Sequence, residues 1–123
     1  MKDRNSNIIY EKSFNFAVKI IELYRYLSNE NKEYILSKQL LKSGTSIGAN
    51  VREAIEGQSK KDFIAKLAIA LKEATETEYW LDLLRETKYI DNGKYESLSV
   101  LVKEIIKILN SIIKTAKKIR NSC

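Results

Sequence analysis

Apolar residues recur at intervals of three and four along most of the chain, which is the spacing of one face of an α-helix. Short polar stretches at residues 28–32, around Gly57 and around Asp91 interrupt this pattern. The predicted helices cover about residues 13–28, 33–56, 60–88 and 92–119. Because short connections favour antiparallel neighbours, the pattern predicts an all-α, up-down-up-down four-helix bundle that forms a single domain over residues 1–123.

Each predicted helix has one apolar stripe that we expect to face the core. The stripe of the first helix is Phe14, Ala17, Ile21 and Tyr24, and that of the second is Leu36, Leu40, Gly44, Ile47, Val51 and Ile55. The third helix has Phe63, Leu67, Ala70, Ala74, Thr77, Leu81 and Leu84, and the fourth has Tyr95, Leu98, Val102, Ile105, Leu109, Ile112, Ala116 and Ile119. The last two stripes alternate steps of three and four, as seams between packed helices do.

The ends of three helices carry capping signals. Gly57 can adopt the left-handed geometry that often ends a helix, so we expect it to cap the second helix. Ser59 and Asp62 have the spacing of a capping box at the start of the third helix. Asp91 is the expected cap of the fourth.

The third and fourth helices carry more apolar residues than one seam needs. The additional positions are Ile64, Leu71, Tyr79, Trp80, Leu83, Leu101, Ile106, Ile108 and Ile113. Large apolar surfaces are rarely exposed on soluble monomers, so we expect a self-association surface that includes Tyr79, Trp80, Leu83, Leu101 and Ile108. The alternative is a wide stripe buried in the core.

Three of the four glycines fall between Ser43 and Phe63, within an apolar pattern of helical spacing. An interior glycine costs a helix up to ~1 kcal/mol, so Gly44 and Gly48 suggest that another helix or a ligand approaches closely. A polar line runs beside them through Ser46, Asn50, Glu53 and Gly57. These polar residues either form hydrogen bonds within the bundle or border a ligand groove.

The composition supports a helical protein with a basic surface. The chain has no proline, 44% hydrophobic residues and a net charge of +6. Its apolar runs are far shorter than the ~20 residues that span a bilayer. The only cysteine, Cys123, has no partner for a disulfide within the chain. We therefore expect a cytoplasmic protein with no membrane partner.

The residue types argue against an enzyme. The chain has no histidine, which removes the commonest general base and the Glu-x-x-His ligands of di-iron bundles. The glycine spacing fits neither a P-loop nor a dinucleotide-binding turn. A carboxylate cluster for a hard cation is conceivable from Glu53, Glu56, Glu73 and Glu76, but pairing with basic residues or solvent is the favoured interpretation. We expect no catalytic residues, metal or cofactor.

Lysines of the fourth helix point to a different activity. Lys103, Lys107, Lys114, Lys117 and Lys118 lie within roughly 100° of one another on a 3.6-residue helix. Such a face can bind phosphates of RNA or DNA, and Lys60, Lys61 and Lys66 form a second, smaller cluster. The alternative is an ordinary solvated face, because no aromatic residue lies among these lysines for base stacking.

Two stretches resemble a known family. These are SFNFAVKIIELYRYL and SGTSIGANVREAIEGQSKKDFIAKLAIALKEATETEYWLDLL, and the resemblance covers about Ser13 to Ile119. They are similar to small bacterial four-helix-bundle proteins, some encoded within intervening sequences of 23S ribosomal RNA genes. The resemblance implies a homopentameric ring with a central channel, although many members carry proline where this chain has Gly48. Relatives include the accessory protein that binds reverse transcriptase and nucleic acid in diversity-generating retroelements, and most members have no known biochemical role.

Two functions follow as hypotheses. The first is a non-enzymatic, ring-forming protein that binds the backbone of RNA or DNA without sequence specificity, as an accessory to a larger nucleic-acid machine. The second is a protein-interaction scaffold that uses the Gly44–Gly57 region or the Tyr79–Trp80 face and does not contact nucleic acid.

Overall fold

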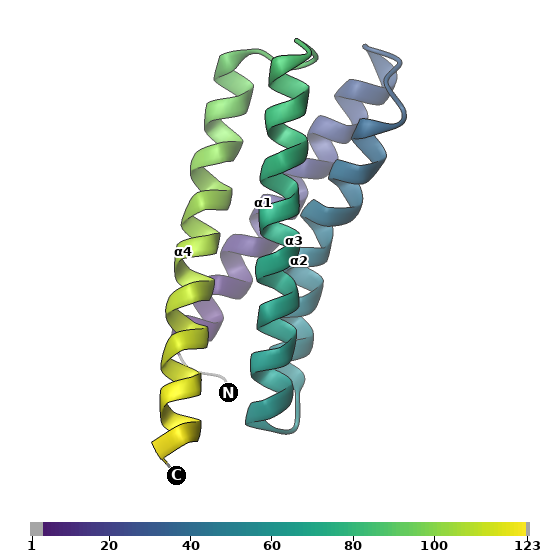
Figure 1. Cartoon of the computed structure of the whole chain (residues 1–123). Helices are drawn as coiled ribbons and strands as arrows, with labels where there is room; N and C mark the ends of the chain where they lie inside the picture. Colours follow the sequence, from purple (N-terminus) through teal and green to yellow (C-terminus); the bar gives the residue numbers. More distant parts are fainter. Residues whose placement is uncertain (1–3, 123) are drawn as a thin grey trace.

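The computed structural model describes residues 4–122, and all regular secondary structure in this range is α-helical. The four helices are α1 (Arg4–Asn29), α2 (Leu36–Glu56), α3 (Lys60–Glu86) and α4 (Asn92–Ser122), as Figure 1 shows. The predicted four-helix, all-α fold is therefore confirmed. The helices α1 and α4 extend beyond their predicted bounds, because α1 begins at Arg4 rather than Ser13 and α4 continues past Ile119.

Each helix packs against two of the others. The helices α1 and α3 each contact both α2 and α4, with the most extensive packing between α2 and α3 and the least between α1 and α4. In Figure 1 the connections 30–35 and 87–91 lie at the upper end, which we name the 30–35 end. The 57–59 connection, the start of α1 and the end of α4 lie at the lower end, which we name the 57–59 end.

The predicted core seams are largely correct in three helices. Every residue of the predicted α3 seam is buried. In α2, Leu36 and Ile55 are only half-buried against the core. In α4, Ile113 is buried while its neighbour Ile112 is half-buried, and Ile119 is 45% exposed rather than part of the core.

The predicted stripe of α1 is wrong. Phe14 is 54% exposed, and Ala17, Ile21 and Tyr24 are half-buried. The core is instead formed by a second apolar stripe of the same helix, which contains Ile9, Phe16, Ile20, Leu23 and Leu27. Both stripes have helical spacing, so periodicity alone did not distinguish them.

Close contact between α1 and α2 explains which stripe is buried. A Cβ atom on Gly44 would lie 2.8 Å from Cγ2 of Ile20, so only glycine allows this approach. A Cβ atom on Gly48 would lie 3.4 Å from the carbonyl oxygen of Ser13, which is an ordinary contact. Gly44 therefore serves close helix packing, whereas the packing around Gly48 would accommodate a methyl group.

The start of α2 depends on Glu33, which the sequence prediction had placed inside the helix. Its carboxylate accepts hydrogen bonds from the backbone N–H groups of Ile35, Leu36 and Ser37 at 3.1, 2.9 and 2.7 Å. Burial by itself would raise the pKa of Glu33, but these backbone N–H groups together with the Ser37 hydroxyl lower it below its ordinary value. The ionised carboxylate therefore satisfies the free amides at the helix start.

The remaining three caps lie at the predicted residues, Gly57 included, but the predicted geometry of Gly57 is wrong. The Ser59 hydroxyl accepts a hydrogen bond from the Asp62 N–H at 3.0 Å, and Asp91 Oδ1 accepts one from the Lys94 N–H at 2.8 Å. Gly57 is not left-handed, since its φ of −64° and ψ of 157° are extended. Positive φ angles occur instead at Lys32 (54°) and Lys88 (66°), in the other two connections.

Candidate nucleic-acid interface and the groove between α1 and α2

The five predicted α4 lysines are all exposed, but they are not equivalent. Lys103 donates a hydrogen bond to Glu78 Oε2 of α3 at 2.9 Å. This hydrogen bond is the main reason that the pKa of Lys103 is raised from its ordinary value. The charge of Lys103 is therefore offset by a carboxylate, which sets it apart from Lys107, Lys114 and Lys117.

The last turns of α4 bring part of the predicted α4 lysine cluster to the same end of the bundle as Lys60 and Lys61. Residues 105–119 of α4 contain four lysines and no acidic residue. Lys60 and Lys61 are exposed in the first turn of α3, which packs against α4 and begins at the 57–59 end (Figure 1). Lys66 instead pairs with Glu53 at 3.0 Å. Lys107 lies near the middle of α4, and the later α4 lysines lie toward the 57–59 end. We name the exposed lysines of these two helices the lysine surface: Lys60, Lys61, Lys107, Lys114, Lys117 and Lys118.

The polar line of α2 is engaged within the bundle. Ser46 Oγ donates to the Lys42 carbonyl at 2.7 Å, and Asn50 Nδ2 donates to the Ser46 carbonyl at 2.9 Å. Glu53 pairs with Lys66 of α3. Gly48 lies on another side of α2, against Ser13 of α1, so the predicted groove residues do not form one site.

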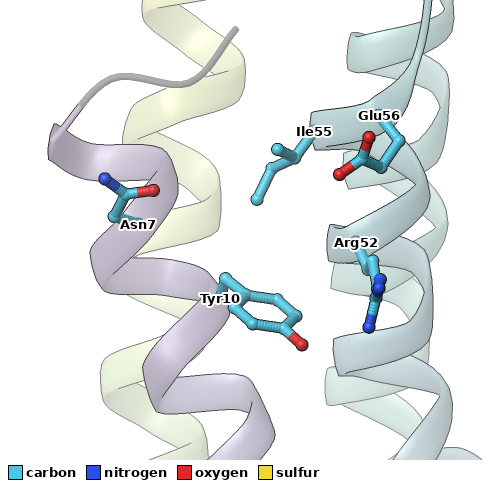
Figure 2. A pocket seen from close by; sticks show the side chains of 5 residues that line it. All are labelled: Asn7, Tyr10, Arg52, Ile55 and Glu56. Atoms are coloured by element: carbon cyan, nitrogen blue, oxygen red, sulfur yellow. The ribbon is translucent and has the colours of Figure 1, made fainter.

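A hollow that the sequence did not predict lies between α1 and α2. It has a volume of about 300 Å³ and is lined by Asn7, Tyr10, Arg52, Ile55 and Glu56, and we name it the α1–α2 hollow. Figure 2 shows Asn7 and Tyr10 projecting from α1 on one side and the other three residues on α2 opposite them. Because α2 ends at Glu56, the hollow lies near the 57–59 end.

A shallower extension continues from the hollow along the same two helices. It has a volume of about 190 Å³, shares Tyr10 and Arg52 with the hollow, and is also lined by Phe14, Ala17, Thr45, Gly48 and Ala49. The rings of Tyr10 and Phe14 are 6.1 Å apart between centroids and tilted by 45°. The sequence analysis missed this surface because it assigned Phe14 to the core.

Residues 5–111 match the family model of the 23S rRNA-intervening sequence protein. The chain belongs to this family. A similar solved structure is that of a protein with unknown function from the S23 ribosomal protein family of Bacteroides thetaiotaomicron VPI-5482. The two chains are 58% identical, the match covers 89% of this chain and 98% of that one, and the TM-score is 0.88. No curated protein matches the chain.

In this family member, the candidate self-association residues differ in exposure. Tyr79 is 57% exposed and contacts Trp80 edge to face, with 5.1 Å between ring centroids. Trp80 donates a hydrogen bond from Nε1 to Glu76 Oε2 at 3.2 Å. Trp80, Leu101 and Ile108 are half-buried against the core, and Leu83 is also half-buried. Two of the surplus residues, Ile64 and Ile113, belong to the core itself, as the wide-stripe alternative predicted.

The structure does not assemble the conceivable carboxylate cluster. Within residues 4–122, no three His, Cys, Asp or Glu residues are grouped so that they could hold a metal ion. Glu53 pairs with Lys66, and Glu76 accepts the hydrogen bond from Trp80. Cys123 lies outside the described residues. In the described part of the chain, none of the helices is both long and apolar enough to cross a bilayer.

Proposed function

We propose that this family member is a non-enzymatic homo-oligomeric protein that binds the sugar-phosphate backbone of RNA or DNA through the lysine surface. The observation that carries the proposal is the set of exposed lysines formed by Lys60 and Lys61 at the start of α3 together with Lys107, Lys114 and Lys117, which run from the middle of α4 toward the same end. The last three belong to a stretch of α4 without any acidic residue. The family description, which refers to intervening sequences of 23S rRNA, is consistent with a nucleic-acid partner.

The geometry favours backbone contacts over base readout. The axes of packed helices lie ~8–10 Å apart, so lysines on α3 and α4 can reach several neighbouring phosphates. Each neutralised phosphate releases a counterion, which makes affinity depend steeply on salt. Phosphate contacts carry little sequence information, so the lysine surface binds without sequence specificity.

We further propose that the antiparallel up-down-up-down bundle is the protomer of a homopentameric ring. Tyr79, with its 57% exposure, is the most exposed of the candidate interface residues and extends the half-buried Trp80 and Leu83 outward. A ring would repeat the lysine surface in every protomer and so multiply the number of contacted phosphates. Such an assembly would act in the cytoplasm as an accessory to a larger nucleic-acid machine.

The nucleic-acid proposal is tested by a salt titration of the purified protein with mixed RNA and DNA ladders. Binding should be strongest at ~50 mM salt and should weaken along a straight line of log affinity against log salt. If neither ladder shifts at the lowest salt, backbone binding is wrong and the protein-interaction scaffold becomes the better hypothesis.

The assembly is tested separately by light scattering coupled to size exclusion. The wild-type mass should be a multiple of the 14.2 kDa chain, and five copies are expected. Tyr79→Glu should reduce that mass because it places a charge in the proposed apolar interface. A stable 14.2 kDa species at micromolar concentration would overturn the ring.

A further inference from the structure

We propose that the α1–α2 hollow binds an unpaired nucleobase of a single-stranded nucleic acid whose neighbouring phosphates contact Lys60 and Lys61 of the lysine surface, across the 57–59 connection. This inference rests on the proposed function and adds a base contact that the lysines alone do not supply. Its ligand class is therefore a single strand of RNA or DNA with at least one unstacked base.

The hollow has the size and the aromatic wall for a planar ligand. Its volume of about 300 Å³ is at the lower end of the range for small-molecule pockets, which suits a single base. Tyr10 lines it, and Phe14 stands beside Tyr10 with 54% of its surface exposed. Exposed aromatic rings form stacking platforms for single strands, because every base has a π-face.

The polar residues of the hollow match the edges of a base. Arg52 is exposed on α2, and its planar guanidinium can stack on a base or donate hydrogen bonds to it. The Asn7 amide both donates and accepts hydrogen bonds, as the Watson–Crick edges of bases do. Ile55 supplies an apolar wall between them. Figure 2 shows these groups on the two sides of one opening.

The charged side chains around the hollow favour an uncharged base inside it and the phosphates outside it. Glu56 offsets the charge of Arg52 in the hollow, and Glu11 lines the space beside Tyr10 and Phe14, so this position attracts a phosphate less than Lys60 and Lys61 do. Lys60 and Lys61 follow Glu56 directly across the 57–59 connection. A strand could therefore place a base in the hollow and its neighbouring phosphates on these lysines. In an intact duplex the bases are stacked and paired, so the hollow selects single strands.

The experiment compares three labelled ligands of about 12 nucleotides by fluorescence anisotropy with the intact assembly. They are a single strand, a duplex, and a single strand in which the central nucleotides are abasic. The wild type should bind the normal strand roughly five- to a hundredfold more tightly than the abasic strand, as expected for base stacking on an aromatic ring.

Two variants remove the aromatic faces and one provides the control. Tyr10→Leu and Phe14→Leu should each weaken binding of the normal strand toward the abasic level while leaving abasic and duplex binding unchanged. Because Phe14 is mostly exposed, its variant keeps the test valid even if Tyr10→Leu unfolds the protein. Tyr34→Leu removes an aromatic ring of similar exposure, 49%, at the 30–35 end and should have no effect.

A photo-crosslink identifies the contact directly. A strand carrying 5-iodouracil should crosslink to Tyr10 or Phe14, and mass spectrometry of the digested product locates the modified peptide. Equal affinity for normal and abasic strands, with crosslinks away from α1, would overturn the base site and leave backbone binding intact. Failure of all three ligands to bind would overturn both proposals together.

Discussion

The two ends of the bundle use their polar side chains differently. At the 30–35 end, Glu33 caps α2, and Asn31 Nδ2 donates to the Tyr89 carbonyl at 3.4 Å. Tyr95 donates its hydroxyl proton to Asp82 at 2.6 Å, and the Arg85 guanidinium lies 3.8 Å from the centre of the Tyr95 ring. These contacts join neighbouring helices to one another and to the connections between them.

The 57–59 end also has a cap, Ser59 with Asp62, and an ion pair, Glu53 with Lys66, but it adds exposed lysines to them. Lys60, Lys61, Lys114 and Lys117 are exposed toward this end, and the α1–α2 hollow opens close by. The contrast suggests a division of roles, in which hydrogen bonds at one end hold the helices in register and the other end binds a partner. Substitutions at the first end should then affect stability, and those at the second should affect binding.

The largest expected effect is on binding by the lysine surface. Combining Lys107→Glu, Lys114→Glu and Lys117→Glu should weaken nucleic-acid binding roughly a hundredfold at low salt and reduce the salt slope, because about three phosphate contacts are lost. Thermal unfolding should change little, since these side chains are exposed.

The matched control reverses the charge of three exposed lysines that lie nearer the 30–35 end, and its substitutions are Lys38→Glu, Lys42→Glu and Lys88→Glu. This variant has the same net charge as the first but should keep most of the affinity. Equal losses in the two variants would show that overall charge, and not the lysine surface, governs binding.

The next largest effect is on stability at the 30–35 end. Glu33→Gln should lower the free energy of unfolding by about 3 kcal/mol at neutral pH, because three backbone N–H groups lose a charged acceptor. Chemical denaturation of the two proteins measures this difference. Nucleic-acid binding at the other end should remain unchanged.

The same pair of proteins tests the pKa of Glu33. Because folding lowers this pKa, the carboxylate stabilises the protein above the unfolded value of ~4.3, and this contribution is lost as the pH falls through the folded value. The stability difference between wild type and Glu33→Gln should therefore be constant near neutral pH and shrink in acid. A difference that does not change between pH ~7 and ~3 would contradict the role of the ionised carboxylate.

A smaller effect distinguishes two glycines one helical turn apart. Gly44→Ala should destabilise the protein by about 2 kcal/mol, because its methyl group would overlap the stiff, buried side chain of Ile20. Gly48→Ala should be neutral or stabilising by up to ~1 kcal/mol, since alanine favours the helix and the space exists. Denaturation midpoints compare the two, and similar losses in both would refute the close-approach argument for Gly44.

The smallest expected effect concerns Lys103, which pairs with Glu78 between the two ends. Lys103→Gln should reduce nucleic-acid affinity less than Lys107→Gln, because the Lys103 charge is already offset. Its effect on stability should stay below ~1 kcal/mol, as for other exposed ion pairs. Parallel titrations of the two variants provide the comparison. A larger loss of affinity for Lys103→Gln than for Lys107→Gln would indicate that the binding surface lies nearer to α3.

The sequence was sufficient where one apolar seam was regular over the whole helix or a cap had a local signature. The α3 seam and the caps at Ser59 and Asp91 were predicted correctly, since they depend on residues within one or two turns of each other. In α1 two stripes had the same spacing, and the prediction chose the one containing Phe14. Glu33 was missed although its three N–H partners are also close in sequence, because the predicted helix began at residue 33 and so placed Glu33 inside the helix rather than before it.

The sequence by itself determined the helical class, most of the helix boundaries and the supply of lysines, because periodicity, capping and composition act over short distances along the chain. Only the tertiary structure decided which face of α1 is buried, through the contact between Ile20 and Gly44. It also decided that the start of α3, with Lys60, and the end of α4 lie at one end of the bundle, and that Tyr10 and Arg52 line one hollow. These relations join residues far apart in the sequence, and they exist only after whole helices have packed against one another.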